Sequence, residues 1–425
     1  MIKVAKPSIE KTASIIGITF QHILIALPAI LAVPVLFGAI VGLNQMEMLR
    51  MTQASILISG LMTILHSIKY KGLGSNAPMV IGSDMIVVAI GIRAASQMNL
   101  RTFFLMIAVG AIFSWGLSYF LPKRLKAISP SVIISTMMIY CISFLPVTLD
   151  WFLGGVGSPD YGSMRSILVG AATFIFTLFL NQYGRGMLKF GSIGIGLIFG
   201  FSISLPMGLI KWSESGSTWF SVPEIMPYIP TVNWNTAVMV IPIIVVLLVK
   251  QLMDLFVYSK QNELSNEEQT LLIQNGMRTN AIGYLLAFFL GAVPTSAQTQ
   301  NFGINSFLQT ESKRSIIFAG FILIIVGLMP KLSSLLVFIP LPVLGAMGLL
   351  LITSLFNMSI QGAKHITWTN KSLMVFSLSF IFGLLALFKP GMGFAFGQGV
   401  KVLIESAICV TFFTGLFLEF VIPDN

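Results

Sequence analysis

The chain is poor in charged residues. Asp, Glu, Lys and Arg make up 9% of its 425 residues, whereas 56% are hydrophobic and the mean hydropathy is +0.90. Soluble domains carry roughly 25% charged residues, and a chain of this length needs a polar surface to stay in water. The scarcity of charge therefore excludes a soluble protein and predicts an all-α polytopic membrane protein.

Cysteine is scarce as well. The two cysteines, Cys141 and Cys409, both lie in apolar runs, where they offer neither a disulfide framework nor the spacing of a metal site. The chain also lacks a phosphate-binding loop, a histidine-rich metal cluster and a nucleophile elbow. We therefore expect no enzyme activity, no organic cofactor and no bound metal.

What the chain does contain is a series of long apolar runs separated by polar breaks. About 20 apolar residues cross a bilayer as a helix, and about fourteen segments fit this description, although several are short. Their approximate bounds are 15–42, 51–67, 78–94, 102–121, 127–147, 164–183, 190–210, 238–258, 279–293, 296–309, 314–331, 335–357, 372–388 and 396–421.

The net charge of +10 follows the loops between these segments. When the N-terminus is placed in the cytoplasm, every loop on that side is basic, as at Lys69 and Lys71 or at Lys313 and Arg314. Cytoplasmic loops of membrane proteins carry such an excess of Lys and Arg. We therefore predict a multi-pass protein of the cell membrane with both termini cytoplasmic, and no nucleic-acid partner.

Two of the apolar regions contain polar breaks. GLGSNAPMVIGSDMIVVA (Gly72–Ala89) opens the third span, and GAVPTSAQTQNFG (Gly291–Gly303) leads into the third span of the second seven. Irregular chain survives at membrane depth only where it is buried in protein or lines a cavity. Transporters built from inverted halves place such breaks at matching positions around their substrate. We predict two inverted repeats of seven spans with short extended pieces in spans 3 and 10; the alternative, that these polar groups only join helices, stays open.

Four stretches of the chain resemble the nucleobase–ascorbate transporter family, which includes bacterial uracil and xanthine permeases. They are QHILIALPAILAVPVL (Gln21–Leu36), IGSDM (Ile81–Met85), PTSAQTQNFG (Pro294–Gly303) and MPKLSSLLVFIPLPVLGAMGLLL (Met329–Leu351). The resemblance implies cation-coupled uptake of a small heterocycle of the uracil, xanthine or urate class. Protons are the expected coupling ion, and sodium is the alternative.

The resemblance also implies a division into two moving parts. A core domain would contain spans 1–4 and 8–11, in residues 1–126 and 238–334. A gate domain would contain spans 5–7 and 12–14, in residues 127–237 and 335–425. Transport would then proceed by an elevator-like movement of the core against the gate.

Family members hold their substrate between the third and tenth spans, and the resemblance carries this site over. The residues expected to contact the substrate are Ser83, Asp84, Met85, Gln298, Thr299 and Gln300. Among these, Gln300 corresponds to the residue that hydrogen-bonds the substrate, and Met85 replaces a common Phe. Asn301 would brace the turn, and His22 would either join helices or carry protons.

Lys250 departs from the family pattern, which usually has a Glu at this position and Asp or His at the position of Asp254. The two residues are four apart and share one helix face. Three interpretations stay open: Lys250 pairs with Asp254 or Asp84, it attracts an anionic substrate, or it carries or replaces the coupling cation. The second keeps an alternative function open, a transporter or exchanger of organic or inorganic anions or a channel-like member of the same fold.

One GxxxG motif, Gly196–Gly200, is typical of close helix packing in membranes and is weak evidence for a homodimer. The expected partners are therefore a nucleobase-like substrate, the lipid bilayer and, on this evidence, a second copy of the chain.

Overall fold

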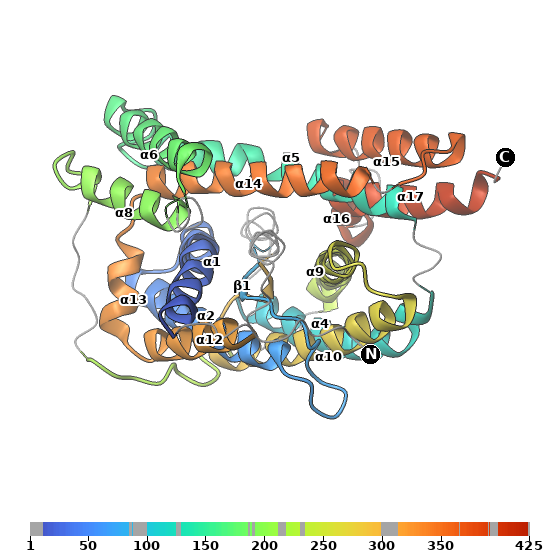
Figure 1. Ribbon diagram of the computed structural model, residues 1–425, viewed down its shortest axis with the longest axis horizontal. Coiled ribbons are helices and arrows are strands. Elements are labelled where there is room, and N and C mark those ends of the chain that lie inside the picture. The colour runs from blue at the N-terminus through green and yellow to red at the C-terminus, as the bar shows by residue number, and fades with distance from the viewer. Residues whose placement is uncertain are drawn as a thin grey trace.

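In the part of the chain that the structure describes, the regular structure is helical apart from two short strands (Figure 1). The computed structural model describes residues 12–84, 87, 100–124, 129–185, 188, 192–210, 218–229, 234–298, 313–364, 366–389, 391 and 398–423. In chain order the elements are α1 (Thr12–Ile40), α2 (Gln45–Ser67), β1 (Ile81–Ser83), α4 (Leu100–Arg124), α5 (Pro130–Phe152), α6 (Met164–Tyr183), α8 (Ser192–Ser204), α9 (Trp234–Gln261), α10 (Asn266–Leu290), β2 (Thr295–Ala297), α12 (Lys313–Gly327), α13 (Pro330–Val337), α14 (Leu341–Ala363), α15 (Asn370–Phe388), α16 (Gln398–Glu405) and α17 (Ala407–Val421).

Six helices in the described part of the chain are long and apolar enough to cross a membrane: α2, most of α4, α5, α6, α14 and α15. They confirm the predicted class of a multi-pass helical membrane protein. The count of fourteen spans stays a prediction.

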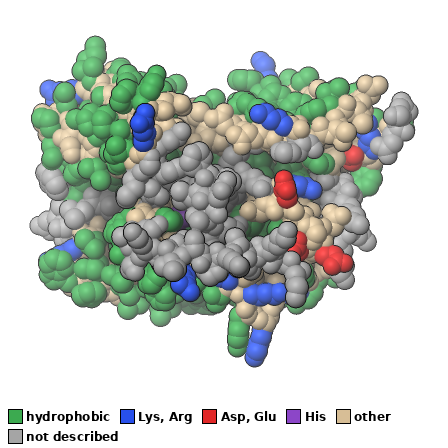
Figure 2. Space-filling view, viewed as in Figure 1, with side chains coloured by type: hydrophobic (Ala, Val, Ile, Leu, Met, Phe, Trp, Pro, Cys, Tyr) green, Lys and Arg blue, Asp and Glu red, His purple; other side chains and the backbone are tan. Residues whose placement is uncertain are grey.

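The helices pack as two groups (Figure 1). Helices α1, α2, α4, α9, α10 and α12 surround both strands, and this group is called the strand bundle. Helices α5, α6, α8, α14, α15 and α17 pack on one another and form the second bundle, which lies above the strand bundle in the view of Figure 1. In the view of Figure 2, hydrophobic side chains gather at the left and lower edges and at the two upper corners, whereas acidic and basic side chains gather at the right.

The contacts inside each bundle are reciprocal between the two halves of the chain. Helix α2 packs on α12, and in exchange α10 packs on α4. Likewise α1 packs on α12 while α9 packs on α4, and in the second bundle α14 packs on α5 and α6. Each half therefore contributes helices that pack against the other half in both bundles.

Small residues let the most closely packed helices approach. A Cβ at Gly60 of α2 would lie 2.6 Å from the carbonyl oxygen of Gly320 in α12, so the two backbones are in contact. In the second bundle, Gly196 and Gly200 of α8 face α6, and a Cβ at Gly196 would overlap the hydroxyl of Thr177. The GxxxG motif is therefore used within one chain, and it gives no support for a homodimer.

The two strands pair antiparallel in the middle of the strand bundle. Their register joins Ile81 to Ala297, Gly82 to Ser296 and Ser83 to Thr295. The extended pieces predicted in spans 3 and 10 are thus confirmed.

Hydroxyl side chains of neighbouring helices bind backbone groups next to the strands. Thr63 of α2 accepts a hydrogen bond from the N–H of Ile81 at 3.0 Å, and Ser55 accepts one from the N–H of Val293 at 3.3 Å. Thr279 of α10 accepts a third, at 2.8 Å, from the loop that precedes β1. These hydroxyls replace the water that a soluble protein would offer to irregular backbone.

A buried histidine holds the loop before β1 in place. His66, at the end of α2, has Nδ1 3.1 Å from the hydroxyl of Ser75 and Nε2 3.0 Å from the amide oxygen of Asn280 in α10. The loop is therefore tied to α2, which contacts β1, and to α10, which contacts β2.

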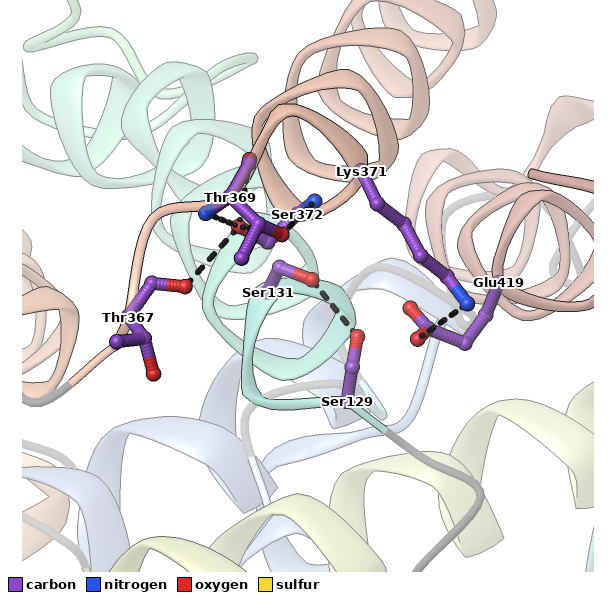
Figure 3. A network of polar contacts seen from close by, with 7 residues as sticks. All are labelled: Ser129, Ser131, Thr367, Thr369, Lys371, Ser372 and Glu419. Atoms are coloured by element: carbon purple, nitrogen blue, oxygen red, sulfur yellow. Dashed lines mark hydrogen bonds and ion pairs between the residues drawn. The ribbon is translucent and has the colours of Figure 1, made fainter. Parts of the chain in front are cut away.

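Polar contacts also join the helices at one end of the second bundle (Figure 3). Lys371 of α15 lies 3.6 Å from the carboxylate of Glu419 in α17, and Thr369 caps α15. Deeper in the bundle, the hydroxyl of Ser379 donates to Ser135 of α5 at 2.9 Å. Helices α5, α15 and α17 are thus held together by polar bonds as well as by apolar packing.

Three predicted span boundaries are wrong. The span predicted at 279–293 belongs to α10, whose polar first half is helical because it is buried against α2, α4 and α9. The span predicted to begin at 335 begins at Leu341, because the chain breaks at Pro340 between α13 and α14. The last predicted span breaks at Ser406, whose side chain caps α17.

We expect Thr63→Val to lower the free energy of unfolding by about 1–3 kcal/mol, because the N–H of Ile81 would lose its acceptor in a buried position. Thermal unfolding of the purified protein in detergent measures the change. Ser67→Ala is the matched control, since Ser67 is equally buried but its hydroxyl bonds to the Thr63 carbonyl of its own helix. If both variants lowered the free energy of unfolding equally, the bond to Ile81 would stabilise the protein no more than a hydroxyl bond within one helix.

Candidate functional site

The crossing of the two strands is the centre of the candidate site. Beyond the three paired residues, the N–H of Asp84 donates to the carbonyl of Pro294 at 2.9 Å, and the N–H of Gln298 donates to the carbonyl of Val80 at 2.9 Å. The pairing therefore extends over five residues of each segment, 80–84 and 294–298, all of them buried. The two polar breaks that the sequence contains meet at this one place.

Side chains strengthen the crossing. The amide Nε2 of Gln298 donates to the carbonyl of Ser83 at 3.2 Å, and the hydroxyl of Ser83 donates to the carbonyl of Ile30 in α1 at 3.2 Å. A Cβ at Gly82 would lie only 2.8 Å from that amide nitrogen, so a larger residue here would displace the Gln298 side chain. Gln298 and Ser83 thus brace the backbone, and their contact with a substrate stays a prediction.

Lys250 and Asp254 form an ion pair on one face of α9. The ammonium nitrogen lies 2.5 Å from each carboxylate oxygen across one helical turn. Lys250 is 6% exposed and Asp254 is 3% exposed, so the pair is withdrawn from water. A single unpaired charge in such a buried position would be costly. The predicted pairing with Asp254 is therefore present, whereas the roles in anion or cation binding stay hypotheses.

Asp84 adds a second carboxylate beside this pair. It directly follows β1, it is 1% exposed, and its charge acts on both Lys250 and Asp254. Helix α9 contacts β2, which brings the two segments together. With every group ionised, the three side chains carry a formal charge of −1 in a buried place.

Tyr140 of α5 brings the second bundle to the ion pair. The ammonium of Lys250 lies 5.2 Å from the centre of the Tyr140 ring, within the range of a cation–π contact. Phe144, one turn further along α5, packs edge-on against that ring with the centroids 4.8 Å apart. Sequence reasoning missed Tyr140, because one tyrosine in an apolar run has no pattern that separates it from an ordinary core residue.

Two buried hydroxyls near the strands have no hydrogen-bond partner among the described residues. They belong to Tyr284 of α10 and to Thr295 of β2. Thr295 faces Gly283, whereas Tyr284 is fully buried within electrostatic range of both Asp84 and Asp254. Buried hydroxyls are normally hydrogen-bonded, so Tyr284 marks a position for a further polar group.

The remaining predicted site residues are only partly placed. Met85, Thr299, Gln300 and Asn301 lie outside the described residues. His22 is described and is buried in α1, which packs against β1. Across the described ranges, no group of three or more His, Cys, Asp and Glu side chains is arranged to hold a metal ion.

Comparison with known proteins identifies the family. A sequence profile of the xanthine and uracil permeases, described as the Permease family, matches residues 13–392. The chain belongs to the nucleobase–ascorbate transporter family. It is therefore a membrane transporter and not an enzyme.

Relatives of known name cover nearly the whole chain. The uric acid permease PucK of Bacillus subtilis is 27% identical over 403 residues, which are 94% of this chain and 93% of PucK. The xanthine permease of the same organism is 24% identical over 408 residues, 96% of this chain and 93% of that protein. The similarity of this chain to both relatives therefore extends over both bundles and is not limited to the two strands.

A solved structure shares the fold. The transmembrane domain of the cyanobacterial bicarbonate transporter BicA superimposes with a TM-score of 0.59 over 95% of this chain and 97% of that domain. Its sequence is 14% identical, so the likeness shows the fold alone.

We expect Asp254→Asn to lower the free energy of unfolding by about 3–5 kcal/mol, because the ammonium of Lys250 would be left buried without its carboxylate. The double variant Lys250→Met with Asp254→Leu removes both charges and should recover most of this loss. Unfolding of the purified protein in detergent gives the comparison, with Asp150→Asn at the partly exposed end of α5 as the control. An Asp254→Asn variant as stable as the wild type would show that the ion pair adds little to folding.

Proposed function

We propose that the protein imports an oxopurine or related nucleobase, of the xanthine, urate or uracil class, across the cell membrane. The observation that carries this proposal is the buried crossing of residues 80–84 with 294–298, in a chain whose relatives are a uric acid permease and a xanthine permease. If a helix begins after each strand, its first N–H groups have no partner within the helix. These groups would bind the carbonyl oxygens of the base.

We propose Gln300 as the main hydrogen-bonding ligand, with Thr299 and Met85 beside the base and Asn301 as a brace. The amide of Gln300 offers a donor and an acceptor side by side, which suits the lactam edge of an oxopurine. Gln298, two residues earlier, supports this placement because it is held at the crossing itself.

The alternative function, transport of an inorganic or organic anion, depended on a free positive charge at Lys250. Asp254 contacts that charge with both carboxylate oxygens, and Asp84 adds a further negative charge nearby. A lysine that is already paired with a carboxylate offers little free positive charge to an anion. The arrangement therefore favours a base that is recognised by its hydrogen-bonding edge.

The proposed movement displaces the strand bundle, as the core, against the second bundle, as the gate. A cavity of about 500 Å³ lies between α9 on one side and α5 and the end of α14 on the other. Its lining residues Met137 and Val257 are each three residues, about one helical turn, from Tyr140 and Asp254. Lys260 and Lys364 at this end support a cytoplasmic location, so we propose that the structure is inward-facing.

The reciprocal packing of the two halves supports the arrangement of fourteen spans in two inverted repeats. Antiparallel pairing of β1 with β2 supports it too, because segments related by a two-fold axis in the membrane plane run in opposite directions. With an even number of spans, the basic loops support a cytoplasmic location for both termini.

Two buried carboxylates, those of Asp254 and Asp84, support proton coupling. Keeping a carboxylate ionised at membrane depth is costly, so carboxylates in such places are suited to bind and release a proton. We therefore propose proton symport, with the proton bound at this cluster.

Radiolabelled xanthine taken up by cells that express the protein should show saturation and competition by unlabelled urate or uracil. Gln300→Ala should raise the KM for xanthine about tenfold or more, because removing a hydrogen bond to the base costs on the order of 1.5 kcal/mol. Gln53→Ala is the control, since that amide donates to the carbonyl of Ser221 in a loop before α9. Uptake that never saturates would indicate a channel, and a flux that no nucleobase inhibits would refute the proposal.

Uptake into proteoliposomes should rise several-fold when the outside is acidic relative to the lumen, and an uncoupler should remove the stimulation. The reason is that an inward proton gradient keeps the cluster protonated on the side where the base enters. An imposed sodium gradient at equal pH is the control. Stimulation by sodium with no response to the proton gradient would replace protons by sodium as the coupling ion.

A further inference from the structure

Part of the connection between α8 and α9 is bound to the surface of the strand bundle. This part, residues 218–229, is called the strap, and it runs along the lower left edge of the strand bundle in Figure 1. The N–H of Ser221 donates to the carbonyl of Leu328, just after α12, at 3.1 Å. The N–H of Met226 donates to the carbonyl of Phe289, near the end of α10, at 2.6 Å. The backbone of the strap is thus fixed to two helices of the strand bundle.

Side chains of α2 hold the strap as well. The amide Nε2 of Gln53 donates to the carbonyl of Ser221 at 2.9 Å, and Arg50 forms an ion pair with Glu224 at 2.9 Å. Glu224 is the one charged residue in the sequence of the strap, TWFSVPEIMPYI. The strap therefore uses its single charge in binding to α2 and has no other charged side chain to offer to water.

The strap lies beside membrane-crossing helices and not beyond their ends. Gln53 is eight residues, about 12 Å, inside the start of α2. At the other end of the strap, the ring of Tyr228 stacks on Phe104, four residues inside the start of α4, with the centroids 4.8 Å apart. Both helices are long and apolar enough to cross a membrane. Non-helical backbone at this level needs partners within the protein, and Pro223 and Pro227 reduce that need because they have no N–H.

The side of the strap that faces away from the bundle is apolar. Its large apolar side chains that are more than half exposed are Trp219, Phe220, Val222, Ile225 and Ile229. They continue an exposed apolar surface of the strand bundle, because Phe289 and Ile325, next to the carbonyls that the strap binds or close to them along the chain, are exposed too. Figure 2 shows hydrophobic side chains along this edge of the molecule. A continuous exposed apolar surface of this kind marks a contact with another molecule or with a membrane.

We propose that the strap binds the outer leaflet of the bilayer through these five side chains and anchors the strand bundle in the membrane interface. The strap follows the seventh predicted span, so a cytoplasmic N-terminus places it on the outer side. Lipid is the occupant that the surface favours, because the apolar side chains continue the surface of helices that cross the membrane. Tryptophan beside the polar groups of a helix end is typical of the membrane interface.

Fluorescence quenching of a label at Val222→Cys, in protein reconstituted into phosphatidylcholine liposomes, tests the contact. We expect lipid that is brominated on its acyl chains to quench this label as it quenches one at Phe321→Cys, an exposed residue in the middle of α12. Val156→Cys is the matched control, since Val156 is 74% exposed and Val222 is 73% exposed, but Val156 lies in the loop between α5 and α6. External iodide should quench the Val156 label several-fold more than the Val222 label. The two native cysteines are buried, and wild type treated with the label gives the background.

Ile225→Cys is a second position on the same face, for use if Val222→Cys does not fold. Lipid contact is refuted if iodide quenches the strap label as strongly as the Val156 label while brominated lipid leaves it bright, because the strap then lies in water. It is refuted equally if neither quencher reaches the label, since another protein or a second copy of the chain then covers the strap. These measurements use no nucleobase, so their outcome is independent of the proposed function.

Discussion

Extended chain at membrane depth has to find hydrogen-bond partners within the protein, and the architecture follows from that requirement. Residues 80–84 and 294–298 satisfy each other's backbone, although they are more than 200 positions apart in the sequence. Neither segment has this partner until the two halves of the chain have come together. The reciprocal packing of α2 on α12 and of α10 on α4 holds the halves in that relation. Hydroxyls on α2 and α10, where an ordinary membrane helix would have Leu or Val, bind the backbone groups that remain.

The same crossing fixes where the charges lie. Asp84 follows directly after β1, so its position is set by its own backbone bond to Pro294. Lys250 and Asp254 lie on the helix that contacts β2. The cluster is thus carried by the strand bundle, and the second bundle meets it through the ring of Tyr140. The contact between the Lys250 ammonium and the face of this ring therefore joins the two bundles at the cluster.

How much of this could be read from the sequence depends on the length scale of each signal. Extended pieces in spans 3 and 10 were predictable, because Pro and clustered polar residues break an apolar run locally. The Lys250–Asp254 contact was predictable too, because a spacing of four places both on one helix face. The helical first half of α10 was not, because it is polar and is stabilised by burial against three other helices. Tyr140 and the His66 network depend on contacts between elements far apart in the chain, and no local pattern marks them. Gln300, the residue with the strongest sequence argument for binding, lies outside the described residues, so its placement still depends on the resemblance.

If the strand bundle moves across the membrane as proposed, its charge determines how the membrane potential acts on it. Moving one elementary charge through the membrane potential costs or yields about 2.3 kcal/mol per 100 mV, in addition to the cost of keeping that charge in a low-dielectric medium. On α9, Lys250 and Asp254 carry opposite charges that sum to zero. The Glu that the family usually has at the position of Lys250 would instead place a negative charge beside the carboxylate of Asp254. The lysine therefore changes the charge on this face of α9 by two elementary charges, as well as the chemistry of the site.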